Sequence, residues 1–542
     1  MSNSSIIPVS GVFSPIPDTI ASGQSAVPGP SFLQYIWKKK ANRRRLLIAL
    51  TGMILQFVIF KFLYPFPDFF SDSYSYIYAA YAHLDVSIWP IGYSKFLAAF
   101  HTLTHSDTAL VAFQYLFLEL AALYFYFTIL FLFHADKATR ITLFVFLFFN
   151  PLFLYLSNYV SSDSLFAALS LWWLSELVWI INRPRLYQVF TQGVLLFLCF
   201  TFRNNAYYYP FIAVAAFLLS CQRPLTKLTG CLFGPLLILP FVLHTRAITK
   251  EITGTAQYSL FTGWQLANNA LYIRDKVQID TARFPSVETS ELDLVAREFF
   301  RKIPHDVGFR DYLESSTGNF YIIRSDAPLR EFARTYAHKT QGRHEGNNPV
   351  MEKYSGAAAW GRASSIFAQY GIYLIRTHPL AFARYFLLPN MLNYFLPPLE
   401  KLEVYNLGLD NIPPSVADWF GLPETELQSV SKRAQGGVLY IYPFLFLWLN
   451  IQVLASFGWF FVSKQYQKLQ PGKSKTLLLA GLFWIANFSF TLLATINVFR
   501  YQVVPMILYI ASSLLLLEQF AKKRSTDTNT FQHPPTVINA VI

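Results

Sequence analysis

The sequence predicts an all-α polytopic membrane protein, a helical bundle of about ten transmembrane helices with an external, mainly α-helical domain. Of its 542 residues, 54% are hydrophobic and 14% are charged, whereas soluble proteins carry about 25% charged residues. Apolar runs such as 109–133 exceed the roughly 20 residues with which a helix crosses a bilayer. Lysine and arginine gather in short connections between such runs, as they do in the cytoplasmic loops of membrane proteins.

The first segment, 1–45, is expected to be cytoplasmic. Residues 1–34 are rich in Ser, Pro and Gly and contain no apolar core, a composition typical of a disordered tail and not of a signal peptide. Six basic residues follow between Lys38 and Arg45. Their charge places the start of the first span on the cytoplasmic side.

Seven spans are predicted in the segment 46–243, which includes a long first external loop, 65–106. Acidic residues in that loop and in 158–163 mark the external face, because the alternate connections are basic. The segment 189–220 has basic flanks on both sides, so it is expected to cross twice, with a polar turn starting at Arg203. The spans are 46–64, 107–133, 141–157, 164–181, the two halves of 189–220, and 229–243.

The remainder of the chain is expected to form an external domain followed by three spans. Residues 244–437 are polar with mixed charge at first, and their later part, 366–400, is apolar but interrupted by arginines and prolines. This pattern predicts interfacial helices on the outer surface. The last spans lie in 438–518, and the tail, 519–542, is expected to be cytoplasmic. These spans are 438–462, 476–497 and 501–518, which makes ten in all and leaves both termini inside.

Several function classes find no support in the sequence. The net charge of +13 comes from basic residues distributed over short loops, which indicates membrane topology and no nucleic-acid partner. The three cysteines lie within or beside spans, so they imply no disulfide framework. The chain contains no glycine-rich phosphate loop, no internal repeat and no Cys/His cluster with metal-ligand spacing.

Two carboxylates at the start of the first external loop are the strongest indication of function. Asp68 and Asp72 occur in the sequence Pro65-Phe-Pro-Asp-Phe-Phe-Ser-Asp-Ser-Tyr, directly after the first span. Carboxylates beside a bilayer are costly unless they are solvated, cap a helix or act in a site. Ser71 or Asp72 would cap a helix that follows, and the alternative is a carboxylate directed into a cleft.

Other charged side chains are expected at the same membrane face. Asp163 lies in the second external loop, in Ser161-Ser-Asp-Ser, where an N-cap is again the simpler alternative. Arg203 and Arg500 lie at predicted external ends of spans, where an arginine commonly extends its head group to the interface. Two arginines with two or three aspartates at one face also form a suitable site for a phosphate and a hydroxyl.

These residues together resemble the GT-C superfamily of integral-membrane glycosyltransferases, especially the family 39-like protein mannosyltransferases and aminoarabinose transferases. The resemblance covers 46–243 and extends weakly to 366–400 and 501–518. It implies a GT-C-like helical bundle. The residues that carry it are Asp68, Asp72-Ser73-x-Ser75-Tyr76, Pro90-Ile91-Gly92-Tyr93, Ser162-Asp163-Ser164-Leu165, Arg203-Asn204-Asn205, His378-Pro379 and Arg500-Tyr501.

The resemblance implies a role for each candidate site residue. Asp72 would be the catalytic base, with Asp68 as its rival, and Asp163 would orient the acceptor or hold a divalent metal ion. Arg203 and Arg500 would bind the donor phosphate. The candidates for sugar or acceptor binding are Tyr76, Trp89, Tyr93, Asn204, Asn268 and Asn269. Core packing is an alternative for the three aromatic residues, and capping or turn formation is an alternative for Asn268 and Asn269.

The function implied is transfer of a sugar from a polyprenyl-phosphate-linked donor to a hydroxyl of a glycan, lipid or protein at the external face, with inversion of the anomeric carbon. No cofactor is required by this chemistry, although a divalent metal ion is possible. The expected location is a bacterial inner membrane, with the active site facing the periplasm and membrane lipids as partners. The alternatives are a transporter or flippase of lipid-linked glycans, and a non-catalytic protein of envelope assembly.

Overall fold

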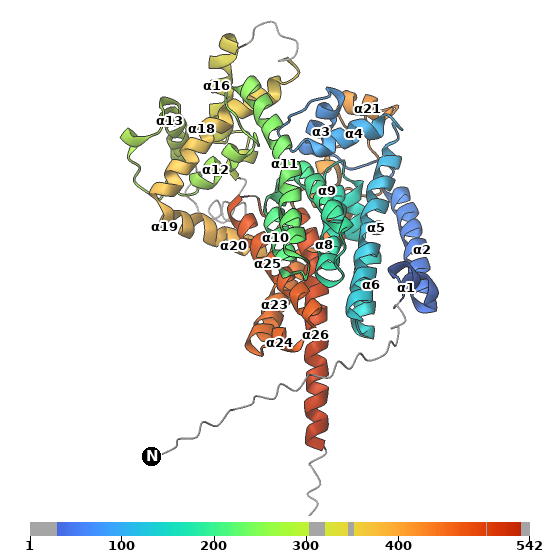
Figure 1. Cartoon of the computed structure of the whole chain (residues 1–542). Helices are drawn as coiled ribbons and strands as arrows, with labels where there is room; N and C mark the ends of the chain where they lie inside the picture. Colours follow the sequence, from blue (N-terminus) through green and yellow to red (C-terminus); the bar gives the residue numbers. More distant parts are fainter. Residues whose placement is uncertain (1–29, 303–319, 345–351, 495, 533–542) are drawn as a thin grey trace, which may run out of the picture. The chain divides into compact units, whose positions relative to one another are not determined.

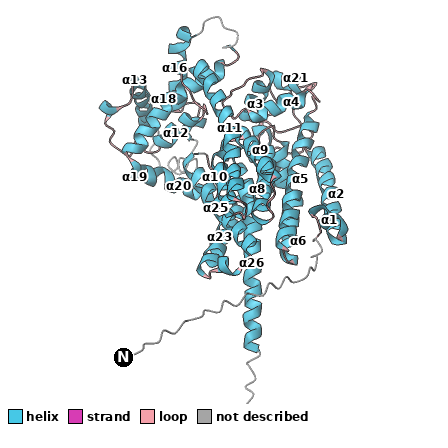
Figure 2. Cartoon of the chain, in the orientation of Figure 1, coloured by secondary structure: helices cyan, strands magenta, loops and turns pink. Residues whose placement is uncertain are grey.

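The computed structural model describes residues 30–302, 320–344, 352–494 and 496–532. Regular structure in these ranges is helical, and they contain no strand, only two isolated bridges (Figure 2). The all-α class is therefore confirmed for this part of the chain. Most of the predicted N-terminal tail, and the last ten residues of the predicted tail 519–542, lie outside it. The chain divides into two compact units, 1–45 and 46–542.

The described part of the first unit consists of a short helix and the start of a long one. α1 (Phe32–Lys38) begins with a capping box between Ser31 and Gln34, which satisfies two backbone donors that the helix leaves unpaired. Within this unit, Asn42 Nδ2 donates to the Tyr35 carbonyl at 3.0 Å. The basic cluster of residues 38–45 begins at the last residue of α1 and includes the first residues of α2 (Lys40–Leu63).

In the described ranges, eight helical stretches are long and apolar enough to cross a membrane (Figure 1). They confirm the composition-based prediction of a multi-pass membrane protein at this level, since each exceeds the length that spans the hydrocarbon core. Three of them consist of two consecutive helical elements. The stretches are Lys40–Leu63 (α2), Asp107–Phe133 (α5), Lys137–Asn158 (α6 and α7), Asp163–Asn182 (α8), Pro224–Thr253 (α11), Ala434–Val462 (α22 and α23), Pro471–Ala494 (α25) and Phe499–Ala521 (η6 and the start of α26).

The segment predicted to cross twice forms two shorter helices. α9 (Tyr187–Phe202) and α10 (Tyr209–Leu219) are separated by extended Arg203 and the 3-10 turn η1 (Asn204–Tyr208). The break lies at the predicted turn, because Arg203 leaves the helical region with φ −151° and ψ 144°. Neither helix reaches the length of the eight stretches, so the count of ten crossings stays a prediction.

Helix α8 lies at the centre of the apolar bundle and is the most buried of the eight stretches. It packs against α5, α9, α10, α25 and α26, while α9 packs against α11 (Figure 1). The loop 65–106, which was predicted to be external, adds two helices, α3 (Ser71–Tyr81) and α4 (Gly92–His101), which pack against each other. The beginning of α8 therefore meets the first loop and the end of α9.

The polar segment after α11 builds its own apolar core. α12 (Thr262–Leu271) packs most closely on α18 (Ser355–Thr377). A Cβ atom on Gly263 would lie 1.7 Å from the Ser364 carbonyl oxygen, so only glycine permits this approach. The other helices of the segment are η2 (Thr281–Arg283), α13 (Val287–Lys302), α15 (Phe320–Ile323) and α16 (Pro328–His344).

The stretch predicted as interfacial, 366–400, is broken into short pieces. After α18 the chain turns at His378 into α19 (Pro379–Phe382), a π-helical turn η3 (Ala383–Leu387) and α20 (Leu388–Phe395). Leu380, Leu388 and Leu392 are exposed, as expected for helices that contact lipid at one face. The connection to α22 then carries η4 (Glu400–Leu402), η5 (Tyr405–Gly408) and α21 (Pro414–Phe420).

Helix α11 continues ten residues beyond the predicted domain boundary at 243 and ends at Thr253, where Gly254 adopts a left-handed conformation with φ 78°. Glycine adopts this conformation without the steric penalty that a side chain brings. Pro235 and Pro240 lie inside the helix. The external position of the segment 244–437 stays a prediction.

Candidate functional site

Asp72 lies in the first turn of α3, between two cations. The N-cap of this helix is Phe70, whose backbone N–H donates to Ser73 Oγ at 3.1 Å, so the capping alternative for Asp72 is wrong. Lys401 Nζ lies 3.2 and 3.3 Å from the two carboxylate oxygens of Asp72. Arg500 Nη2 lies 3.5 Å from Oδ2 of the same carboxylate. Asp72 therefore forms ion pairs with Lys401 and Arg500.

Asp163 is the first residue of α8 and pairs with both predicted arginines. Arg203 Nη1 contacts its Oδ1, and Arg500 Nη1 lies 3.1 Å from its Oδ2. Ser161 Oγ donates to the same Oδ2 at 2.8 Å. A carboxylate in the first turn of a helix is also favoured by the helix dipole. The structure therefore brings together Asp163, Arg203 and Arg500, which the sequence placed in three separate external turns.

The two guanidinium groups share an aromatic partner. Tyr501 follows Arg500 in η6 (Phe499–Gln502), and its ring centroid lies 4.3 Å from the guanidinium carbon of Arg203 and 4.7 Å from that of Arg500. Arg500 Nη2 also donates to Tyr501 Oη at 3.1 Å. Cation–π contacts and the common partner Asp163 offset the repulsion between two neighbouring arginines.

Sequence reasoning missed two charged residues that complete the group. Glu400 and Lys401 occupy η4, and Glu400 Oε2 lies 3.5 Å from Arg500 Nε. The available signal was the pair of adjacent charges at the end of the apolar stretch 366–400. We call the six residues the ion cluster: Asp72, Asp163, Arg203, Glu400, Lys401 and Arg500.

The ion cluster contains three cations and three carboxylates, and the six side chains are largely buried. The exposed fractions of the side chains range from 4% at Asp163 to 18% at Lys401 and Glu400. Charges in such an environment are tolerated when they are paired and hydrogen-bonded. The described ranges contain no group of three or more His, Cys, Asp or Glu that could hold a metal ion. A role for a divalent ion stays a prediction.

A cavity of about 300 Å³ opens beside the ion cluster, and we call it the site cavity. Asp72, Arg203 and Tyr501 form its charged wall. The opposite walls come from η1, from the start of α12 and from the end of α25. The remaining lining residues are Tyr76, Trp89, Pro90, Phe202, Asn204, Asn205, Tyr207, Ser259, Phe261, Thr262, Gln265, Leu266, Phe490, Leu493, Ala494 and Ile496.

Asp68, the rival of Asp72, lies in a different environment and does not line the site cavity. Its carboxylate accepts hydrogen bonds from the backbone N–H of Asn406 at 2.8 Å and from Gln435 Nε2 at 3.4 Å. Its backbone forms an isolated bridge with Tyr159. Burial raises the pKa of Asp68 from 3.8 to about 7, against the lowering effect of these hydrogen bonds.

The predicted sugar-binding aromatic residues differ in their access to the site cavity. Tyr76 lines it, and its hydroxyl lies 3.0 Å from Ser162 Oγ. Trp89 also lines it, with its ring centroid 5.0 Å from that of Phe261. Tyr93 is completely buried and donates to Gln114 Oε1 at 2.7 Å. The structure therefore places Tyr93 in the core, as the packing alternative proposed.

The three asparagines that were predicted to bind the sugar or acceptor also differ in their access to the site cavity. Asn204 lines the site cavity, and its Oδ1 is buried without a hydrogen-bond partner among the described residues. Asn268 and Asn269 are buried in α12 and do not line the cavity. Asn268 Oδ1 accepts from the Tyr321 N–H at 3.0 Å, and Asn269 Nδ2 donates to the Leu493 carbonyl at 3.2 Å. Both hold α12 to its neighbours.

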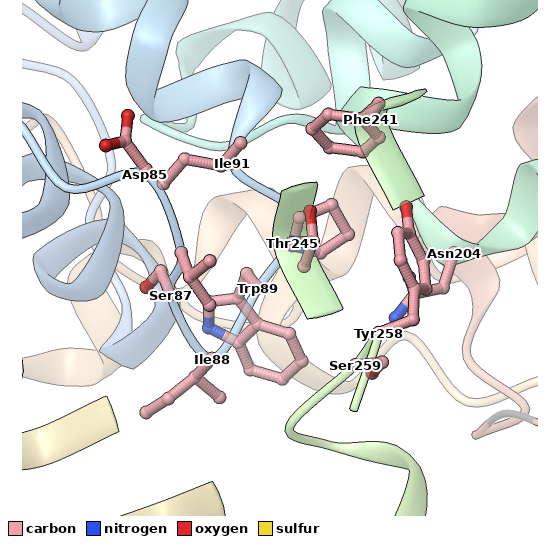
Figure 3. Close-up of a pocket in the computed structure, with 12 residues that line it drawn as sticks. Asp85, Ser87, Ile88, Trp89, Ile91, Asn204, Phe241, Thr245, Tyr258 and Ser259 are labelled. Atoms are coloured by element: carbon pink, nitrogen blue, oxygen red, sulfur yellow. The ribbon is translucent and has the colours of Figure 1, made fainter. Parts of the chain in front are cut away.

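A second, much smaller cavity adjoins the site cavity and shares Trp89, Pro90, Asn204 and Ser259 with it. Its volume is about 20 Å³, little more than the space that one water molecule needs. Figure 3 shows its labelled side chains arriving from the first external loop, from η1, from α11 and from the segment before α12. The smaller cavity is therefore too small for a ligand the size of a sugar.

Comparison of the chain with protein families, with curated proteins and with solved structures found no match in any of the three. The resemblance to GT-C glycosyltransferases accordingly rests on the residues quoted above.

Proposed function

We propose that this chain is a GT-C-type membrane glycosyltransferase that transfers a sugar from a polyprenyl-phosphate-linked donor to a hydroxyl acceptor. One observation carries the proposal: Asp72 and Arg203, from segments far apart in the sequence, both line the site cavity. A carboxylate can accept the proton of a hydroxyl nucleophile. A guanidinium group can bind a phosphate through paired hydrogen bonds.

The proposed reaction is a single displacement at the anomeric carbon. The acceptor oxygen forms a bond to that carbon while the bond between the carbon and the phosphate oxygen breaks. The bonding electrons leave with the polyprenyl phosphate, whose charge Arg203 stabilises. Asp72 takes the proton from the acceptor hydroxyl. Because attack and departure occur on opposite faces of the sugar, the anomeric configuration inverts.

The other members of the ion cluster receive positioning roles in this proposal. Asp163 and Arg500 do not line the site cavity, so they act through their neighbours. Asp163 holds Arg203 by an ion pair, and Arg500 joins Asp163 to Asp72. Lys401 contacts both oxygens of Asp72. Direct phosphate binding therefore falls to Arg203, and the phosphate role expected for Arg500 becomes an indirect one.

The proposed setting is a bacterial inner membrane with the site cavity facing the periplasm. The polyprenyl donor would lie among membrane lipids, and the acceptor would be a glycan, lipid or protein hydroxyl. The exposed position of Leu493 at the cavity wall supports access from lipid, because 50% of this side chain is accessible.

The test is sugar transfer by the full-length protein in lipid nanodiscs, supplied with polyprenyl-phosphate-linked sugars. Asp72→Asn should lower the transfer rate at least about 100-fold, since a positioned general base contributes about 10²–10⁴-fold. Asp85→Asn is the matched control, because Asp85 lies in the same loop but forms an exposed ion pair with Lys95. This control should retain the transfer rate.

Two results would contradict the proposal at different points. Full transfer by well-folded Asp72→Asn would remove Asp72 from the role of base. Absence of transfer and of sugar release with every lipid-linked sugar would remove the glycosyltransferase assignment itself.

A transporter or flippase is the second candidate, favoured by two carboxylates buried within apolar helices. Glu119 lies in α5 and Glu176 in α8, and Tyr124 donates to Glu176 at 2.8 Å. Intramembrane carboxylates commonly mark transport pathways. Proteoliposomes separate the two functions, because a flippase moves the intact lipid-linked sugar whereas the enzyme breaks its sugar–phosphate bond.

A further inference from the structure

The basic cluster of residues 38–45 concentrates positive charge without nearby acids. It contains six Lys and Arg, and no Asp or Glu occurs between residues 30 and 67. In the described ranges, no carboxylate lies within ion-pair distance of any of the six. Lys40 and Arg44 are four residues apart in α2, where like charges repel each other. An external anion would offset this repulsion.

Contacts within the first unit fix the arrangement of the cluster and leave most of its cations accessible. Lys39 Nζ lies 4.6 Å from the ring centroid of Tyr35. Arg45 Nη1 donates to Asn42 Oδ1 at 2.8 Å, and Asn42 donates to the Tyr35 carbonyl. These contacts join α1 to the first turn of α2. The remaining four cations have exposed side chains: Lys38, Lys40, Arg43 and Arg44.

The length of α2 places the cluster at the depth of lipid head groups. The apolar part of this helix, residues 46–63, rises about 27 Å at about 1.5 Å per residue, close to the hydrocarbon thickness of about 30 Å. The preceding residues of α2, 40–45, add about 9 Å, and the head-group layer on each side is about 5–8 Å thick. When α2 crosses a bilayer, its first cations therefore lie beside the lipid phosphates.

Helix α1 adds an exposed apolar pair next to these charges. Leu33 and Trp37 are 66% and 54% exposed, and their spacing of four residues places them on one face of the helix. Tyr35 and Ile36 of the same helix are buried. Tryptophan is common where lipid meets water. An apolar helix face beside basic residues is typical of a helix that lies in this interface.

We propose that α1 and the basic cluster form a binding surface for anionic phospholipids. Its cations bind the head-group phosphates, and its apolar pair contacts the lipid beside the head groups. Each basic residue near an anionic membrane contributes about fivefold in affinity. Basic residues that flank a span suffice to set its orientation, whereas lipid binding also uses the apolar pair. We call this set the lipid surface: Leu33, Trp37, Lys38, Lys40, Arg43 and Arg44.

Native mass spectrometry of the full-length protein in detergent tests the proposal by titration with dioleoyl-phosphatidylglycerol and dioleoyl-phosphatidylcholine. The anionic lipid should bind at least about tenfold more tightly than the zwitterionic one. When ammonium acetate is raised from about 0.1 M to about 1 M, this preference should fall, because the Debye length shortens from about 10 Å to about 3 Å. Equal affinity for the two lipids at the lower salt concentration would overturn the proposal.

A pair of charge-matched variants locates the binding surface. The first replaces the four exposed cations of the lipid surface by glutamine, and its preference should drop below about threefold. The second removes the same charge from exposed positions in other connections and should keep the preference. Retention of the preference in the first variant, or an equal loss in both, would overturn the proposal. The first variant is Lys38→Gln, Lys40→Gln, Arg43→Gln and Arg44→Gln, and the second is Arg185→Gln, Arg223→Gln, Lys464→Gln and Lys468→Gln.

A third variant keeps every charge that orients α2, so it remains informative if the glutamine variant fails to insert. Leu33→Ser combined with Trp37→Ser should weaken phosphatidylglycerol binding at least about tenfold, since full burial of one large apolar side chain exceeds this factor. Unchanged binding would overturn the proposal. The soluble head group, glycerophosphoglycerol, should bind the wild type more weakly than the lipid does. Equal affinity would assign the surface to a free anion and would overturn it as well.

Discussion

Asp68 and Asp72 lie four residues apart in the loop that follows α2, yet they occupy opposite kinds of environment. Asp68 is surrounded by neutral donors, the Asn406 N–H and Gln435 Nε2, and contacts no cation within ion-pair distance in the described ranges. Asp72 is paired with Lys401 and Arg500 and reaches the site cavity. The difference shows that proximity to the membrane alone does not make a carboxylate part of a site.

The connection between α20 and α22 supplies hydrogen-bond or ion-pair partners to the carboxylates of both Asp68 and Asp72. η4 brings Lys401 to Asp72, and the following turn brings Asn406 to Asp68. Glu400, Asn406 and Leu407 adopt positive φ angles of 55°, 48° and 52°, and each such non-glycine residue costs about 1–3 kcal/mol. This strain persists because the contacts to the two aspartates hold the connection in place.

The largest stability effect should come from breaking the ion cluster at Asp163. Asp163→Ala removes the common partner of Arg203 and Arg500 and leaves two buried cations without it. Removing one member of a buried ion pair typically costs about 3–5 kcal/mol. Unfolding in detergent should show this loss, whereas Asp85→Ala, at an exposed pair, should cost less than about 1 kcal/mol.

If Asp163→Ala had the same free energy of unfolding as the wild type, the ion pairs of Asp163 with Arg203 and Arg500 would not stabilise the fold. The contrast between a charged region around Asp72 and a neutral region around Asp68 would then lose its basis.

A stability effect of comparable size is expected at Asp68, and it depends on pH. Its folded-state pKa of about 7 lies above the ordinary value of 3.8, so the folded protein binds more protons between these values. The free energy of unfolding should therefore be highest near pH 4 and fall as pH rises through about 7. For each difference of one between the pKa of the folded state and that of the unfolded state, the free energy of unfolding changes by about 1.4 kcal/mol.

Thermal melting in detergent across pH 4 to 8 measures this dependence. Asp68→Asn, a neutral residue of similar shape, should flatten the profile in this window while preserving sugar transfer. A profile that stays unchanged in this variant would show that Asp68 is not the titrating group, and lost transfer would bring Asp68 back as a base.

The smallest effect is expected at Glu400, the member of the ion cluster with the weakest contact. Its single ion pair with Arg500 spans 3.5 Å, and its side chain is among the most exposed of the six. Glu400→Gln should change the free energy of unfolding by less than about 1 kcal/mol. The matched control is Glu403→Gln, at an exposed carboxylate three residues away. A loss as large as that of Asp163→Ala would place Glu400 among the essential pairs.

Particular elements show how far local sequence information reaches. The apolar runs predicted the long helices, and the polar turn at Arg203 predicted the break between α9 and α10. The capping role for Asp72 was wrong, because the backbone of Phe70 is capped by Ser73 instead. Local sequence cannot distinguish these caps, since the side chains of both Ser and Asp can accept a hydrogen bond from a backbone N–H at a helix start.

The candidate site was predicted only in part for a different reason. Four of the six ion-cluster residues were recognised as charges at the ends of apolar runs. Glu400 and Lys401 were missed because their partners lie more than 90 residues away in the chain. Tyr93, Asn268 and Asn269 were proposed as ligand contacts, but their packing against distant segments turns them toward the core.

By itself the sequence determined the helical, multi-pass character of this protein, because hydrophobicity and helix length are local properties that need no tertiary contact. It also identified Asp68, Asp72, Asp163, Arg203 and Arg500 as candidate site residues, with helix capping or extension of the head group to the interface as the simpler alternatives. Only the tertiary structure decided which aspartate lines the cavity and which is buried among neutral donors. The physical reason is that a buried charge depends on its partners, and these partners arrive from segments hundreds of residues away.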